Sequence, residues 1–179
     1  QAAGVQVVMV TGDRRETAVA IARDAGLLRA DSDLVLTSSD LAQMRDEEVQ
    51  RVLPQLRVIA RALPTDKSRI VRLSQKRNLV VGMTGDGVND SPALRRADVG
   101  FAMGSGTEAA RDAGDIVILD DNFRSIKDAI LYGRTIYNNI LKFCRFQLVI
   151  NIAAVVVSAI APFFGIIEPL RVTHLLFIN

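Results

Sequence analysis

LVVGMTGDGVND, at residues 79–90, is the stretch that decides the fold expected of this chain. Its first five residues are a short apolar run, as expected of a buried parallel strand. Two glycines then permit a tight turn, and Asp86 and Asp90 follow the strand as neighbours. Adjacent carboxylates are costly unless a cation neutralises them, and hard oxygen ligands suit Mg²⁺ held jointly with a phosphate. The alternative is a plain turn and helix cap before Pro92, which explains these residues less well.

Strand-like and helix-like segments alternate on both sides of this stretch. We expect strands at residues 5–10, 34–36, 58–60, 79–83, 99–101 and 116–119. We expect helices between them, at residues 14–26, 41–53, 65–76, 91–97 and 107–113. This alternation predicts an α/β, Rossmann-like domain with a parallel sheet covered on both faces. Ligands bind such sheets at the carboxyl ends of the strands.

Two other groups fit a phosphate at that edge. Thr11 and Gly12 follow the first expected strand, where a hydroxyl and a close backbone N–H suit an anion at a helix N-terminus. A strand-to-helix turn with Thr11 or Asp13 as cap is an equally good reading of these residues. Lys67 falls in the first turn of a helix, where its charge opposes the helix dipole, and a phosphate partner would explain it. An exposed surface lysine is the ordinary alternative.

Composition excludes several classes of protein. Hydrophobic residues make up 49% of the 179 residues, which excludes a wholly disordered chain. The 22 Lys and Arg against 20 Asp and Glu leave a net charge of +2, too small for a nucleic-acid partner. A single Cys excludes an internal disulfide framework, and a single His excludes a His-rich metal site.

A membrane span is expected near the C-terminus. Residues 146–167, FQLVINIAAVVVSAIAPFFGII, are 22 residues without a charge, the length that crosses a bilayer. Their position excludes a secretory signal. The preceding stretch is basic and places that side of the span in the cytoplasm; its basic residues are Arg124, Lys127, Arg134, Lys142 and Arg145. Asn151 lies inside the span, where its amide either bonds a neighbouring helix or ligates a cation.

These patterns divide the chain into successive regions. We expect a cytoplasmic domain at residues 1–122, a stalk helix at 123–145, a transmembrane helix at 146–167, a loop at 168–171 and the start of another transmembrane helix at 172–179. The chain begins without Met and stops inside a second apolar run. We therefore expect a fragment of a larger, multi-pass membrane protein.

A resemblance to P-type cation-transporting ATPases rests on MTGDGVNDSPAL at residues 83–94, VMVTGD at residues 8–13, and Lys67. It covers essentially the whole chain. It implies that the sheet belongs to a haloacid-dehalogenase-like phosphorylation domain, that a long helix leads from it into the membrane, and that ATP and Mg²⁺ are bound.

The resemblance also implies roles for single residues. Asp86 resembles the Mg²⁺ ligand, and Asp90 is a further candidate. Asn89 and Asp90 would organise the phosphate and the attacking water. The groups holding the phosphoryl oxygens are implied to be Thr11, Gly12 and Lys67. ARALP, at residues 60–64, is similar to the family's nucleotide-side motif, and the implied ATP contacts are Asp13 and Arg61.

Such pumps transfer the γ-phosphoryl of ATP to an aspartate and then hydrolyse the aspartyl-phosphate. That aspartate belongs to the family's DKTGT motif, which does not occur in these residues. We therefore expect it in the remainder of the same pump chain and expect the fragment alone to be inactive. A soluble haloacid-dehalogenase-like phosphatase and a non-catalytic membrane-anchored binding module are the alternatives; the uncharged span disfavours the first, and the second predicts no Mg²⁺-dependent phosphate binding.

The transported ion is inferred from the apolar segments. Residues 146–155 resemble the fifth transmembrane helix of plasma-membrane-type calcium pumps, and residues 169–179 resemble the start of their sixth. The resemblance makes Asn151 and Asn179 ligands of transported Ca²⁺ and favours the plasma membrane. Ala154 stands where sarcoplasmic-reticulum-type pumps carry Glu, which implies one Ca²⁺ rather than two. Na⁺/K⁺ and H⁺ pumps are the alternatives within the family.

Overall fold

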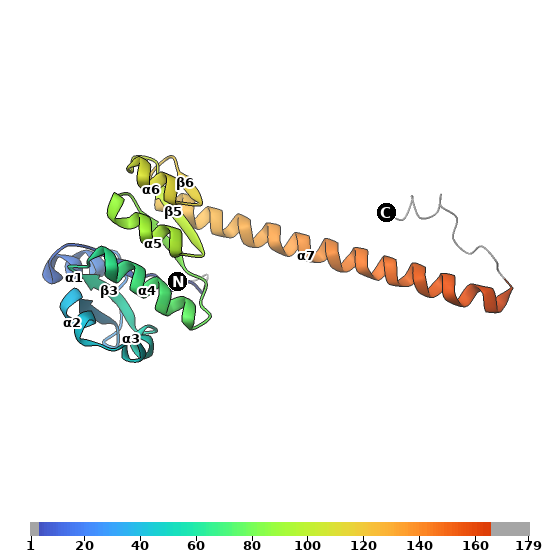
Figure 1. Cartoon of the computed structure of the whole chain (residues 1–179), viewed down its shortest axis with the longest axis horizontal. Coiled ribbons are helices and arrows are strands. Elements are labelled where there is room, and N and C mark those ends of the chain that lie inside the picture. Colours follow the sequence, from blue (N-terminus) through green and yellow to red (C-terminus); the bar gives the residue numbers. More distant parts are fainter. Residues whose placement is uncertain (1–3, 166–179) are drawn as a thin grey trace. The chain divides into compact units, whose positions relative to one another are not determined.

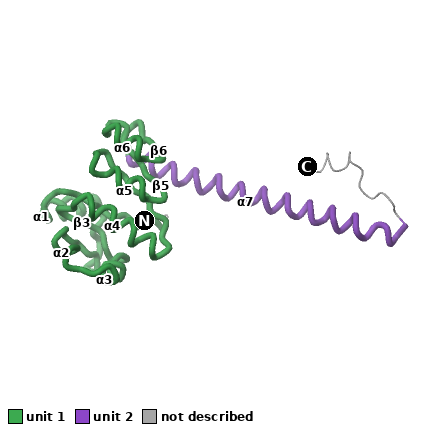
Figure 2. The backbone as a smooth tube through the Cα atoms, viewed as in Figure 1, with its two compact units in different colours: residues 1–122 green, residues 123–179 purple. Residues whose placement is uncertain are grey.

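The computed structural model describes residues 4–165 and divides the chain into two compact units, residues 1–122 and residues 123–179 (Figures 1 and 2). Unit 1 contains the alternating strands and helices, and the described part of unit 2 is helical.

Unit 1 runs through strands and helices in alternation. Its elements are β1 (Met9–Val10), α1 (Arg15–Asp24), β2 (Leu34–Thr37), α2 (Ser38–Gln43), α3 (Asp46–Val52), β3 (Leu56–Ala60), α4 (Pro64–Lys76), β4 (Gly82–Gly85), the short 3₁₀ helix η1 (Val88–Asp90), α5 (Ser91–Arg96), β5 (Val99–Met103), α6 (Glu108–Ala113) and β6 (Ile116–Ile118).

The strands form two three-stranded sheets, ordered β1-β3-β2 and β4-β5-β6, and every pairing in them is parallel. This confirms the predicted α/β class, although the strands form two sheets rather than one. β1 and β4 each lie at an edge of their sheet. Their carboxyl ends lead directly into residues 11–13 and 86–90, the two segments for which the sequence predicts a phosphate site.

Helices cover both faces of the first sheet because the side chains of β3 alternate between them. Val58 and Ala60 pack against Ala18 and Ala22 of α1. Ile59 belongs to a cluster on the other face, whose buried members are Leu36, Leu41, Val49, Leu53, Leu56, Ile59, Ile70 and Leu73. That cluster joins β2 and β3 to α2, α3 and α4, so α4 is fixed on the sheet by its apolar side.

Three expected elements differ from the structure. The strand expected at residues 5–10 pairs with β3 only over Met9–Val10. The strand expected at residues 79–83 is displaced toward the C-terminus and pairs over Gly82–Gly85. Val80 is 85% exposed, so the apolar run is not all buried strand. Before the strand, the main chain of Val81 bonds Asp98 instead: its N–H donates to the carboxylate over 2.8 Å, and its carbonyl accepts from the Asp98 N–H over 3.0 Å.

The helix expected at residues 41–53 is broken into α2 and α3. Long-range contacts stabilise the break, because Arg69 of α4 donates to the carbonyls of Leu41 (2.6 Å) and Met44 (2.7 Å) at the end of α2. Its guanidinium also donates to Asp46, the first residue of α3, over 3.0 Å. These carbonyls therefore have donors without a continuous helix, and the apolar periodicity of residues 41–53 gave no sign of it.

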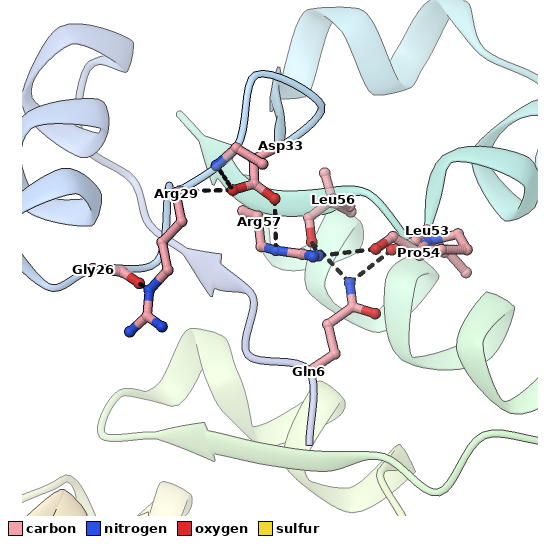
Figure 3. Close-up of polar contacts among 9 residues, drawn as sticks. Gln6, Gly26, Arg29, Asp33, Leu53, Pro54, Leu56 and Arg57 are labelled. Carbon is pink, nitrogen blue, oxygen red and sulfur yellow. Dashed lines mark hydrogen bonds and ion pairs between the residues drawn. The ribbon is translucent and has the colours of Figure 1, made fainter. Parts of the chain in front are cut away.

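Polar contacts fix the amino ends of the first sheet's strands (Figure 3). Gln6 donates to the carbonyls of Leu53 and Leu56 over 2.7 and 2.9 Å. Arg57 lies 3.1 Å from Asp33 in an ion pair. The pKa of Asp33 lies below its ordinary value, chiefly because the backbone N–H groups of Ala30 and Arg29 donate to its carboxylate. This end of the sheet is therefore tied together by its own side chains, away from the strand ends that carry residues 11–13.

Unit 2 begins with α7 (Phe123–Ile160), an uninterrupted helix of 38 residues and about 57 Å at 1.5 Å per residue. The 3₁₀ helix η2 (Ala161–Phe164) follows it, so the α-helix ends two residues before Pro162. In the described part of the chain, this is the one helix long and apolar enough to cross a membrane, with a mean hydropathy of 2.1 in its most apolar window. The expected loop and second span, residues 168–179 with Asn179, lie outside the described residues.

Candidate active site

Asp90 organises the loop that follows β4. Its side chain turns back on that loop, and Oδ2 accepts from the backbone N–H groups of Asp86 and Gly87 at 3.3 Å each. Its own N–H donates to the Gly87 carbonyl over 3.0 Å. Asp90 is only 6% exposed, so these bonds and a charge partner are needed to hold a carboxylate there.

Glycines are required where this loop is crowded. A Cβ at Gly85 would overlap the side chain of Asp90. A Cβ at Gly106 would lie 2.8 Å from the carbonyl oxygen of Asp86. That carbonyl accepts from the Thr107 N–H over 2.8 Å, so the main chain of Asp86 is held between its own loop and the loop after β5.

Lys67 supplies the charge partner. Its ammonium donates to Oδ1 of Asp90 in a close ion pair, and the two side chains are 17% and 8% exposed. Lys67 reaches this position from the first turn of α4, which follows β3 of the first sheet, whereas Asp90 follows β4 of the second sheet. Lys67 is therefore not the exposed surface lysine that the sequence left open.

The loop after β1 is tied to the segment that leads into α4. Thr11 donates its hydroxyl to the Asp13 carboxylate (2.8 Å) and accepts from the Asp13 N–H (3.1 Å). Ala62 N–H donates to the Thr11 carbonyl, and Arg61 N–H donates to the Asp13 carbonyl, both over 2.9 Å. Arg61 adopts a φ of 51°, unusual for a residue with a side chain. Asp13 and Arg61, the two predicted ATP contacts, are thus neighbours, and both are exposed. Their contact with ATP stays a prediction.

The predicted residues thus fall into two bonded groups. One joins Lys67, Asp90 and the main chain of Asp86. The other joins Thr11 and Asp13 to Arg61 and Ala62, just before α4 begins, and Gly12 lies between the two bonded residues of the loop. Asn89 lies exposed in η1 beside the first group. Two positions that support these groups were not among the predicted site residues: buried Asp66 and crowded Gly106, whose partners are distant in sequence.

The carboxylates of Asp86 and Asp90 differ in whether they are available to bind a metal ion. Both oxygens of Asp90 already accept bonds from Lys67 and from backbone N–H groups. Asp86 is exposed and its carboxylate is not engaged in this way. Among residues 4–165, no group of three or more His, Cys, Asp or Glu side chains could hold a metal ion. The donor set therefore fits Mg²⁺ bound by Asp86 together with a phosphate and further oxygen ligands, rather than a closed protein cage.

Comparison with known proteins assigns the chain to a family. Residues 1–98 match the haloacid dehalogenase-like hydrolases, and a second description of haloacid dehalogenase-like hydrolases matches residues 73–130. The chain belongs to the haloacid dehalogenase-like hydrolases. In this haloacid dehalogenase-like domain, Lys67 and the loop of residues 86–90 meet beside the carboxyl end of β4, at the edge for which the sequence predicts a phosphate site.

Relatives extend this assignment over both units. The chain is 46% identical over 177 residues to a calcium-transporting ATPase of Listeria monocytogenes, covering 99% of this chain and 20% of that protein. It is 43% identical over 184 residues to the plasma membrane-type calcium-transporting ATPase 8 of Arabidopsis thaliana, covering 100% and 17%. Identity to the mouse plasma membrane calcium-transporting ATPase 1 is 43% over 195 residues, covering 100% and 16%. The chain thus spans about a fifth of the length of these relatives.

A solved structure agrees. A zinc-transporting PIB-type ATPase in its E2.Pi state superposes with a TM-score of 0.69 and 28% identity, over 89% of this chain and 22% of that one. The catalytic domain of a CPx-ATPase, at 22% identity and a TM-score of 0.50 over 67% of this chain and 37% of that one, shares the fold. The resemblance to P-type ATPases is therefore confirmed.

Proposed function

We propose that this chain is part of an ATP-driven pump that moves Ca²⁺ across a membrane through an aspartyl-phosphate intermediate. One observation carries the proposal: calcium-transporting ATPases match the chain along 99–100% of its length, through the haloacid dehalogenase-like unit and the apolar helix alike. A soluble phosphatase would share only the first unit. A non-catalytic, membrane-anchored binding module predicts no Mg²⁺-dependent phosphate binding.

In this proposal the residues at the strand ends handle the phosphoryl group. Lys67, with Thr11 and Gly12, holds the phosphoryl oxygens, because an ammonium and close N–H or O–H donors stabilise charge on them. Asp90 orients Lys67 and keeps the loop of residues 86–90 closed, while exposed Asn89 lies beside the attacking water. Asp86 binds Mg²⁺, which supplies charge neutralisation for the transferring group when bound. Asp13 and Arg61 contact ATP at the rim.

The phosphorylated aspartate belongs, in this proposal, to a segment of the pump outside these 179 residues. The edge positions of β1 and β4 support this, since each has one side available for a further parallel strand and each ends at the candidate site. A strand from elsewhere in the same protein could deliver its carboxylate there. Accordingly, the 179 residues alone should neither form phosphoenzyme nor transport ions.

The membrane part is proposed to be multi-pass and to lie in the plasma membrane. α7 forms a cytoplasmic stalk and then a transmembrane helix, and Asn151 and Asn179 ligate one transported Ca²⁺ through their side-chain oxygens. The exposure of Asn151 on α7 supports an amide that meets another helix or an ion. Pumps for Na⁺/K⁺ or H⁺ are less favoured, because the relatives along the whole chain are named for calcium transport.

Membrane vesicles that contain the full-length pump provide the test. We expect ATP-dependent uptake of Ca²⁺. We also expect the phosphoenzyme to form from ATP when Ca²⁺ is present, but not when Na⁺ or H⁺ is supplied in its place. Asp86→Asn should raise the Mg²⁺ concentration for half-maximal phosphoenzyme formation by at least about tenfold, since one charged ligand is lost. Unchanged Mg²⁺ dependence would contradict the metal role, and Ca²⁺-independent phosphorylation would contradict the calcium assignment.

A further inference from the structure

A second buried carboxylate lies next to Lys67. Within residues 4–165, the buried charged side chains are Asp66, 8% exposed, and Asp90, 6% exposed. Asp90 has its partner in Lys67. Asp66 occupies the first turn of α4 directly before that lysine, and the proposed chemistry gives it no task.

Asp66 closes the turn that carries Lys67. Its Oδ2 accepts from the Leu63 N–H over 2.8 Å. The Leu63 carbonyl in turn accepts from the N–H groups of Asp66 (3.0 Å) and Lys67 (3.3 Å). Leu63 is thus bonded on both sides, and the backbone of Lys67 is part of the same closed turn.

Ser38 ties this turn to the first sheet. Its hydroxyl donates to Oδ2 of Asp66 over 2.6 Å, across 28 residues of sequence. Ser38 is the first residue of α2 and directly follows β2, whose last residue, Thr37, is in register with Ala60 of β3. The bond therefore links the start of α4 to the carboxyl end of the sheet, where the candidate site lies.

The electrostatics of the first turn of α4 explain why Asp66 stands next to Lys67. A lysine in the first turn of a helix is opposed by the helix dipole, whereas a carboxylate there is favoured. Asp66 supplies that carboxylate one residue away, and its burial requires the two bonds from Ser38 and Leu63. Without these two bonds, the first turn of α4 would not be fixed, and Lys67 would not be held toward Asp90.

We propose that Asp66 and Ser38 are positioning residues that fix the ammonium of Lys67 for the phosphoryl group. This rests on the proposed phosphoryl role of Lys67. Asp66 and Ser38 act through Lys67 and touch neither substrate nor cofactor, so their loss should weaken phosphate binding and leave ATP binding unchanged.

The test uses the full-length pump in membranes, with inorganic phosphate as the probe. Phosphorylation from inorganic phosphate is titrated for the wild type and for Ser38→Ala, Asp66→Asn and Lys67→Ala. Ser38→Ala and Asp66→Asn should raise the half-saturating phosphate concentration by about 10- to 100-fold, the scale of a misplaced catalytic group. The ATP concentration for half-maximal phosphoenzyme formation should stay within about twofold of wild type.

A matched control exists on α3, which carries neither a candidate site residue nor a proposed positioning residue. Glu48 there accepts from the N–H (2.8 Å) and the guanidinium (3.0 Å) of Arg45, so it closes a first helical turn as Asp66 does. Glu48→Gln should lower the unfolding temperature and leave the phosphate titration unchanged. If Asp66→Asn fails to fold, Ser38→Ala, which removes one hydrogen bond, carries the test.

A double-substitution cycle distinguishes the failures. Asp66→Asn should cost less in a Lys67→Arg background than in the wild type, since coupled residues are not additive. Full additivity, or an unchanged titration for both Ser38→Ala and Asp66→Asn while Lys67→Ala is impaired, would overturn the positioning role. An unimpaired Lys67→Ala would instead overturn the proposed function of the lysine itself.

Discussion

At the scale of single residues, the candidate site depends on positions where no side chain fits. Gly85 and Gly106 leave room for Asp90 and for the carbonyl of Asp86. Side-chain chemistry alone does not reveal this, because both glycines could equally serve a turn. The acidic loop is thus shaped by its neighbours as much as by its own sequence.

Gly106→Ala should impair the site without altering any polar group. The new Cβ would lie 2.8 Å from the Asp86 carbonyl oxygen and 3.0 Å from its Cα, so Asp86 must shift. We expect the full-length pump to need at least about tenfold more Mg²⁺ for half-maximal phosphoenzyme formation, since misplacement by about 1 Å is costly. Gly133→Ala in α7, where a Cβ meets nothing within 4 Å, is the control. Equal behaviour of the two variants would refute the role of this close approach.

The candidate site was predictable from sequence only in part. The residues of the GDGVND loop and Lys67 could be named from their types and order, and the structure pairs Lys67 with Asp90. The ion pair of Lys67 with Asp90 joins residues 23 positions apart, so the sequence did not reveal it. For the same reason, the sequence did not reveal that Asp86, rather than Asp90, has the available carboxylate. Asp66 was missed because a carboxylate in a first helical turn looks like an ordinary dipole partner.

At the scale of secondary-structure elements, most of unit 1 could be predicted, but the start of β1, the start of β4 and the break between α2 and α3 could not. The helices after residues 63, 90 and 107 begin where proline or threonine favours a start. The break between α2 and α3 depends on Arg69, which reaches it from α4, and the displaced β4 depends on Asp98. Both are tertiary contacts that local periodicity does not contain.

Asp46 of α3 forms ion pairs with Arg69 and Arg72 of α4, and this α3–α4 clamp should make the stability of the fold depend on pH. The pKa of Asp46 lies below its ordinary value, chiefly because Arg69 donates to its carboxylate and Arg72 adds a second bond. A lowered folded-state pKa means that the clamp contributes stability above the unfolded pKa, about 3.9, and loses it as the pH falls through the folded value. We expect Asp46→Asn to lower the unfolding temperature at pH 7, with a difference from wild type that shrinks below about pH 4.

Thermal unfolding of the full-length protein between pH 7 and pH 3 measures this. Glu47→Gln is the matched control, because Glu47 is an exposed residue of the same turn. It should follow the wild type at every pH. A constant difference between Asp46→Asn and wild type across the range would show that the clamp is not electrostatic.

At the scale of the whole molecule, one chain carries the candidate phosphate site and an apolar helix of transmembrane length. Relatives match 99–100% of the chain, so both parts occur together in those proteins, and we propose that they serve one function. A defect in the helix should therefore differ in kind from a defect at the strand ends.

Asn151→Ala should separate ion binding from phosphoryl chemistry. In the full-length pump we expect at least about tenfold more Ca²⁺ for half-maximal phosphorylation from ATP, because an oxygen ligand is lost. Phosphorylation from inorganic phosphate, which needs no transported Ca²⁺, should persist. Ser158→Ala, a polar change two turns further along α7, is the control. If Asn151→Ala leaves the Ca²⁺ requirement at the wild-type level, Asn151 only packs against a neighbouring helix.

The pairing of Lys67 with Asp90 fastens the strand layer ending in residues 11–13 to the one ending in residues 86–90. In the proposed function, a phosphoryl group would compete with Asp90 for the same ammonium. Its binding would then weaken the ion pair between the two sheets, and its release would restore it, so that the chemical step would change the contact between the two halves of the domain.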